Sequence, residues 1–125
     1  MHNRADFFLT MFRSEMESSL EDVEYLASSY EKKFRRNEIT NYVYNENESF
    51  LALEISELKK ILLFIDSIQT ESCKTAEEMA AVTEALLNKR LEEFDDPDAV
   101  YGIIKRKIGK VLDYLIKRPE DDPGN

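Results

Sequence analysis

Residues that break helices are scarce in this chain, and their scarcity constrains its fold more than any other feature. The 125 residues include only three glycines and three prolines. A β-rich fold needs many tight turns, and those turns usually draw on these two residue types. Apolar residues make up 42% of the sequence and charged residues 34%, the balance of an amphipathic globular protein and not of a disordered one. The composition therefore predicts an all-α fold built from a few long helices.

Four stretches carry apolar residues at intervals of three or four, the spacing of helices that bury one face. We expect helices at residues 4–36, 39–69, 75–95 and 97–118. Thr75 with Glu78 fits a capping box and Asp96 fits an N-cap, whereas Asn37 can end a helix in the left-handed conformation. The second helix could instead begin near residue 46, where a further capping box is possible.

Four amphipathic helices with short connections pack most simply as an antiparallel up-down-up-down four-helix bundle. At ~1.5 Å per residue, the first two helices would be ~50 Å long and the last two ~30 Å long. We expect a single domain over residues 1–118, followed by a disordered tail at residues 119–125. In the last helix, Gly102 is expected to allow close approach of a neighbouring helix, and Gly109 to lie towards the exposed side.

The charge and the single cysteine exclude several classes of protein. A net charge of −9 repels phosphate groups, so binding to nucleic acid is disfavoured. The N-terminal residues lack the uninterrupted apolar core of a secretory signal, and the longest apolar run, residues 61–65, is too short to span a bilayer. The lone Cys73 excludes an internal disulfide and fits a reducing compartment. We therefore expect a cytoplasmic protein that associates with no membrane.

Charge is distributed unevenly along the chain. Residues 1–31 hold two basic and seven acidic residues, whereas residues 97–118 hold six basic and two acidic residues. Because opposite charges attract, we expect the acidic first helix to lie beside the basic fourth helix.

Paired carboxylates are the remaining route to an active site, because the only histidine, His2, stands beside the first methionine. Glu54 and Glu57 share one face of the second helix, and Glu93 and Asp96 share one face at the end of the third. Four such carboxylates could hold Mg²⁺. The arrangement resembles that of the MazG-type pyrophosphohydrolases, which bind magnesium with ExxE and ExxD motifs on a helical bundle. The resemblance covers only these four positions, and the interval between the two motifs is longer than the family's.

One charge on each of two helices falls inside an apolar stripe: Glu54 on the second helix and Arg90 on the third. An unpaired buried charge is very costly. The two residues lie at the same level if the turn between these antiparallel helices centres near residue 72. We predict a partly buried ion pair that fixes the register of the helices. In the alternative, Glu54 is a metal ligand and Arg90 needs another acid.

The long first and second helices should extend beyond the third, which reaches back only to about residue 50. Two helices alone cannot enclose the apolar surface beyond that level, and a contiguous apolar patch usually marks an interface. The predicted interface residues are Tyr30, Phe34, Arg35, Arg36, Val43 and Tyr44. The second helix also carries apolar residues away from its main stripe, which widens its apolar surface: Phe50, Leu53, Ile61 and Phe64.

The sequence thus favours a non-enzymatic helical-bundle interaction protein without a cofactor. We expect it to self-associate as a homodimer, or to bind another protein through the same surface. The alternative function is the carboxylate-metal, MazG-like nucleotide pyrophosphohydrolase. The apolar surface near the turn also has an alternative explanation that involves no interface: the second helix begins near residue 46, and the segment before it folds back over the first helix.

Overall fold

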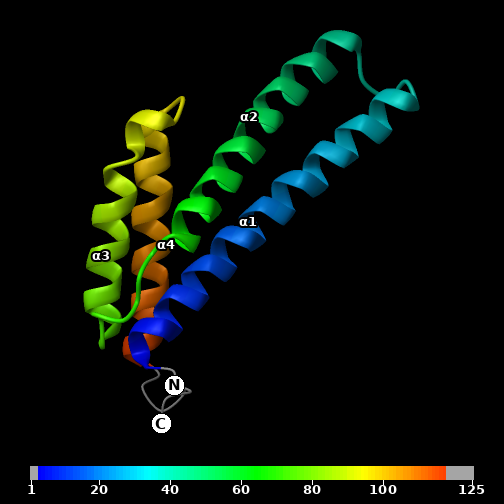
Figure 1. The fold of residues 1–125 in the computed structure, drawn as a ribbon. Coiled ribbons are helices and arrows are strands. Elements are labelled where there is room, and N and C mark those ends of the chain that lie inside the picture. The colour runs from blue at the N-terminus through cyan, green and yellow to red at the C-terminus, as the bar shows by residue number, and fades with distance from the viewer. Residues whose placement is uncertain (1–2, 118–125) are drawn as a thin grey trace. The chain divides into compact units, whose positions relative to one another are not determined.

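A computed structural model describes residues 3–117 of the protein, and these residues form only helices, turns and connecting segments (Figure 1). The helical elements are α1 (Arg4–Arg35), α2 (Asn41–Asp66), α3 (Ala76–Asn88), the short 3₁₀ helix η1 (Leu91–Glu93) and α4 (Pro97–Lys117). The expected all-α class is confirmed. With 32 and 26 residues, α1 and α2 are the longest of the described helices. The expected tail at residues 119–125 lies outside the described residues.

The connection between α1 and α2 uses local capping signals. Asn37 has a φ of 58°, and the backbone N–H of Glu38 donates to the Lys33 carbonyl at 2.9 Å, so the predicted left-handed end of α1 is confirmed. The Thr40 hydroxyl then accepts the backbone N–H of Val43 at 3.2 Å and caps the start of α2. The second helix therefore begins at Asn41, close to the longer of the two predicted starts.

The predicted starts of α3 and α4 are confirmed by their hydrogen bonds. The backbone N–H of Glu78 donates to the Thr75 hydroxyl at 3.1 Å, and the N–H of Thr75 donates to the Glu78 carboxylate, also at 3.1 Å. This is a capping box. At the start of α4, the Asp96 carboxylate accepts the N–H of Ala99 at 3.2 Å. No neighbouring helix approaches Gly102 closely, contrary to expectation, because an added Cβ there would meet no atom within 4 Å.

The predicted ends of the second and third helices are wrong. α2 ends at Asp66, and the Ser67 hydroxyl donates to the carbonyl of Phe64 at 2.7 Å, competing with the helical pattern. α3 ends at Asn88, and the chain then turns through η1. After that turn, Phe94 has an extended backbone, and its buried ring meets the Phe64 ring edge-on at 6.0 Å. Packing of Phe94 into the core thus outweighs continuation of the helix.

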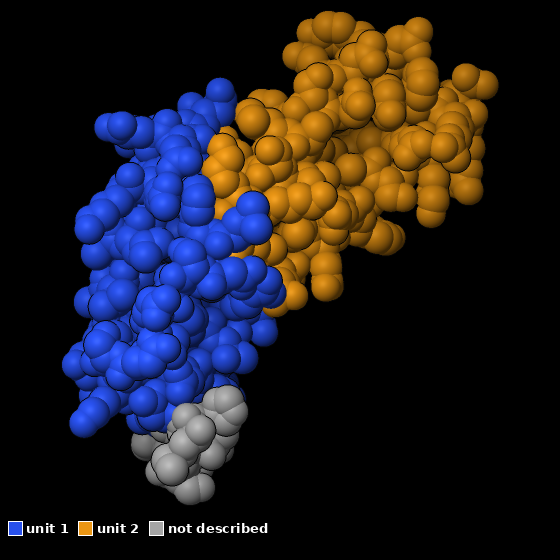
Figure 2. Space-filling model, in the orientation of Figure 1, with its two compact units in different colours: residues 1–15, 63–125 blue, residues 16–62 orange. Residues whose placement is uncertain are grey.

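The chain divides into two compact units, which Figure 2 colours separately. Unit 1 comprises Met1–Glu15 and Leu63–Asn125, and unit 2 comprises Met16–Leu62. Unit 1 therefore holds α3, α4, the start of α1 and the end of α2. Unit 2 is a hairpin made from the rest of α1 and α2. The single domain over residues 1–118 stays a prediction.

Most fully buried side chains belong to unit 1. The largest of them are Phe8, Phe12, Met79, Thr83, Leu87, Ile104, Val111 and Leu115. The rings of Phe8 and Phe12 stack at 6.0 Å on the buried side of α1. Polar bonds to backbone carbonyls hold the start of α1 to its neighbours: the Asn3 amide donates to Cys73 at 3.2 Å, and the Arg4 guanidinium donates to Leu115 at 2.6 Å.

A cluster of three charges joins α1 to α4 within unit 1. The Glu15 carboxylate accepts hydrogen bonds from Lys110 at 2.8 Å and from Lys107 at 3.2 Å. The hydrogen bond from Lys110 is the largest cause of a lowered pKa for Glu15, and Lys107 adds to it, while desolvation acts in the opposite direction. The expected attraction between an acidic first helix and a basic fourth helix is confirmed at this point.

This cluster predicts a pH-dependent stability. We expect Glu15→Gln to lower the free energy of unfolding by about 0.5–1 kcal/mol at neutral pH, the usual contribution of partly exposed ion pairs. Because folding lowers the pKa of Glu15, its stabilising effect is complete above the unfolded-state pKa and is lost as the pH falls through the folded-state pKa. Urea unfolding at a series of pH values measures both. Glu92→Gln is the control, and an effect of Glu15→Gln that did not change with pH would contradict the assignment.

Candidate functional site

The four carboxylates of the possible metal site lie in two different units. Glu54 is exposed and Glu57 half-buried on α2, both in unit 2. In unit 1, Glu93 accepts a hydrogen bond from Arg90 at 3.2 Å, and Asp96 caps α4. Among residues 3–117, no group of three or more histidine, cysteine, aspartate or glutamate side chains is placed to hold a metal ion.

Arg90 lies in the turn after α3 and not on that helix as expected. Its guanidinium pairs with Glu93 three residues later and also lies over the Phe64 ring, 5.0 Å from the ring centre. A cation over an aromatic face is attracted by the electrons of the ring. Arg90 therefore has partners within unit 1, whereas Glu54 belongs to unit 2. The Glu54–Arg90 ion pair stays a prediction.

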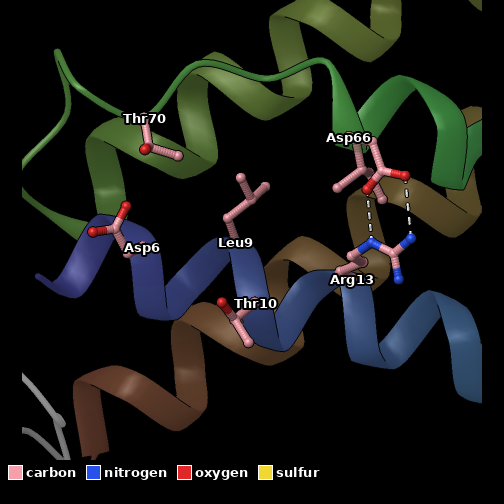
Figure 3. Close-up of a pocket in the computed structure, with 7 residues that line it drawn as sticks. Asp6, Leu9, Thr10, Arg13, Asp66 and Thr70 are labelled. Carbon is pink, nitrogen blue, oxygen red and sulfur yellow. Dashed lines mark hydrogen bonds and ion pairs between the residues drawn. The ribbon is translucent and has the colours of Figure 1, made fainter. Parts of the chain in front are cut away.

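An open groove of about 410 Å³ runs between the start of α1 and the end of α2 with the segment that follows it. It is lined by Asp6, Leu9, Thr10, Arg13, Ile65, Asp66 and Thr70. Figure 3 shows the side chain of Leu9 between Asp6 at one end and the paired Arg13 and Asp66 at the other.

Both carboxylates of this groove already have structural partners. The Arg13 guanidinium donates two hydrogen bonds to Asp66, at 2.8 and 3.2 Å, and the first cause of the lowered pKa of Asp66 is this bonding. Asp6 accepts the backbone N–H of Asn3 at 3.3 Å at the start of α1. The two-bond geometry of the pair joins α1 to the end of α2. The charged residues of the groove are therefore better explained by a structural role, holding α1 to the end of α2, than by a catalytic one.

The predicted interface residues near the α1–α2 turn are partly used within the hairpin. The rings of Phe34 and Tyr44 stack at 4.3 Å with 9° between their planes, and both are half-buried. Tyr30 is also half-buried, and the Lys33 ammonium lies 5.9 Å from the centre of its ring. These aromatic residues therefore hold α1 to α2, and only part of their surface remains for a partner.

The other three predicted interface residues are exposed. Arg35 forms an ion pair with Glu31, one turn earlier in α1. Arg36 lies just beyond α1, and Val43 lies in the first turn of α2. All three side chains are accessible to a partner, and the predicted interface as a whole stays a prediction.

Unit 2 exposes more large apolar side chains than the predicted interface includes. Their exposed fractions are 79% for Tyr25, 45% for Leu26, 71% for Tyr42, 37% for Val43, 77% for Phe50 and 43% for Leu53. Only α1 and α2 contribute to this unit, and each covers one stripe of the other. The exposed residues lie where neither helix covers the other.

The hairpin has two broad sides of different character. A groove of about 410 Å³ on one side is lined by four residues of α1 and four of α2: Glu24, Ala27, Ser28, Glu31, Tyr44, Glu48, Ala52 and Ile55. This acidic groove contains three glutamates and three small residues.

The opposite side carries exposed apolar residues, which we call the apolar face: Leu26, Val43 and Phe50. At ~100° per residue, Leu26 lies on the side of α1 away from the acidic groove, and Val43 and Phe50 lie on the corresponding side of α2. The stack of Phe34 on Tyr44 shows that these two residues lie at the same height along the paired helices. Leu26 lies eight residues before Phe34, and Phe50 lies six after Tyr44, so Leu26 and Phe50 are near neighbours on this face.

The six predicted interface residues did not include Leu26 or Phe50, although Phe50 was expected to widen the apolar surface of the second helix. Both residues were visible as apolar positions, but periodicity alone does not show which apolar residues a neighbouring helix covers. Ile61, which carried the same signal as Phe50, is 1% exposed.

Comparisons with protein-family models, with curated proteins and with solved structures gave no match. Within residues 3–117, none of the helices combines the length and apolar character that a membrane span requires.

The placement of the carboxylates predicts the response to divalent ions. Because Glu93 and Asp96 have structural partners, we expect no heat of binding when Mg²⁺ or Mn²⁺ is added in a calorimetric titration. A stoichiometric binding heat in the wild-type protein that disappears in Glu54→Gln and in Glu93→Gln would contradict this expectation and restore the metal-enzyme hypothesis.

Proposed function

We propose that this chain is a non-enzymatic interaction protein that self-associates as a homodimer through its α1–α2 hairpin. The observation that carries the proposal is the apolar face, where Leu26, Val43 and Phe50 are exposed on a unit of only two helices. Exposed apolar side chains grouped on one side of a unit mark a candidate interface. Two copies of the chain present the same patch, so a closed twofold dimer can bury both patches at once.

We also propose that the four helices form an antiparallel up-down-up-down bundle in which α1 and α2 extend beyond α3 and α4. The lengths support this arrangement, because α3 has 13 residues and α4 has 21. Contacts within unit 1 also support it, since Glu15 binds Lys107 and Lys110 of α4. The proposed location is the cytoplasm, where the free, buried Cys73 would stay reduced.

Burial of Phe50 should supply much of the association energy. Its side chain is 77% exposed, and full burial of a phenylalanine is worth roughly 1.5–3 kcal/mol. Aromatic side chains near the centre of an interface are also frequent sources of binding energy. The polar residues around the apolar face would then form the rim.

Light scattering on the protein as it elutes from a size-exclusion column, at micromolar concentration, tests the proposal. We expect the unmodified chain to have twice its monomer mass of 14.6 kDa. Phe50→Ser should raise the dimer dissociation constant by at least about tenfold, because about 1.4 kcal/mol corresponds to a factor of ten.

Leu63→Ser is the matched control. Leu63 is also on α2 and is 69% exposed, but it belongs to unit 1. The control variant should keep the mass of the wild-type protein. A monomeric wild-type chain, or an equal effect of the two substitutions, would contradict self-association through the apolar face.

A further inference from the structure

We propose that a second copy of this chain docks on the apolar face in the antiparallel sense, about a twofold axis that passes close to Leu26 and Phe50. The inference rests on the proposed self-association and adds the geometry of the contact. Its main support is the order of charges along the same side of α1.

Asp22 and Lys33 flank Leu26 on the side of α1 that belongs to the apolar face, and both side chains are exposed. They are eleven residues apart, or about 16 Å along the helix. The midpoint between them lies at residues 27–28, next to Leu26. Asp22 forms no hydrogen bond or ion pair with another described residue, and the Lys33 ammonium lies against Tyr30. A negative end and a positive end are therefore placed symmetrically about an apolar centre.

An antiparallel docking about that centre brings opposite charges together. When α1 of one copy lies against α1 of the other in reverse direction, Asp22 of each copy faces Lys33 of the other. The same operation places Phe50 of one copy against Phe50 of the other near the axis. Each ion pair then occurs twice, as a twofold interface requires.

A parallel docking brings like charges together. In that arrangement α1 of one copy lies against α2 of the other at the same level. Counting from the Phe34–Tyr44 stack places Asp22 level with residue 56, between Glu54 and Glu57. Opposed carboxylates destabilise an interface, so the charge pattern favours the antiparallel arrangement.

The acidic groove on the other side of the hairpin does not suit a second copy. Glu24 and Glu48 line it without a basic residue among the groove's lining residues, and Glu31 is paired with Arg35. Two copies docked through this side would bring carboxylates against carboxylates. The apolar face is therefore the side on which the two copies meet.

Charge reversal in the full chain tests the geometry. We expect Asp22→Lys and Lys33→Glu, each alone, to raise the dimer dissociation constant by about tenfold or more, since each creates two repulsive contacts. An equimolar mixture of the two single variants should form a heterodimer with near wild-type affinity, because both contacts are again between opposite charges. The double variant Asp22→Lys with Lys33→Glu should regain self-association for the same reason. Sedimentation equilibrium measures all four.

Glu21→Lys and Lys32→Glu are the matched controls. They make the same changes of charge one residue away, where the exposed side chains point to other sides of α1. We expect the controls to leave the dissociation constant unchanged.

The possible outcomes separate the docking geometry from self-association itself. A dimeric wild-type chain whose affinity is insensitive to the two reversals, or equally sensitive to the controls, overturns the antiparallel docking and leaves self-association standing. The absence of a preferred heterodimer in the mixture likewise overturns it. A monomeric wild-type chain overturns the proposed function.

Discussion

A helix packed against a single neighbour can bury only one stripe of its surface, and this limit governs the α1–α2 hairpin. In unit 1, where α3 and α4 add further neighbours, Phe8 and Phe12 of α1 are fully buried. In unit 2, Tyr25 of the same helix is 79% exposed and Phe50 of α2 is 77% exposed. The same two helices pass through both units, and in unit 2 each has only the other as a neighbour.

The polar contacts follow the same division. Arg4, Arg13 and Glu15 each bind a residue distant in sequence, so the first turns of α1 are fixed in unit 1. In unit 2, the Phe34–Tyr44 stack joins the two helices, and the ion pair between Arg35 and Glu31 stays within α1. Charged residues on the apolar face, such as Asp22 and Lys33, remain accessible. In the proposed dimer, these charges would select one orientation of the two copies.

Features set by neighbouring residues could be predicted from the sequence, and those set by distant contacts could not. The caps at Thr75 and Asp96 and the left-handed Asn37 depend on a few adjacent residues, and the structure confirms them. The end of α3 depends on the packing of Phe94 against Phe64, thirty residues earlier, so periodicity placed it too late. The Arg13–Asp66 pair had no local signal at all. The interface in the α1–α2 hairpin stays a prediction, because periodicity does not reveal which aromatic residues the two helices bury against each other.

In the proposed dimer, a second copy covers the exposed part of the hairpin. Hydrogen exchange of the unmodified chain, measured by mass spectrometry over a range of protein concentrations, tests this claim most directly. Association protects the segments that it stabilises against local opening, and it does so by mass action. Exchange in peptides from residues 20–36 and 41–54 should therefore slow as the concentration rises, while exchange in peptides from α3 stays constant. Exchange rates in the hairpin that are independent of concentration, or protection confined to α3 and α4, would contradict the account.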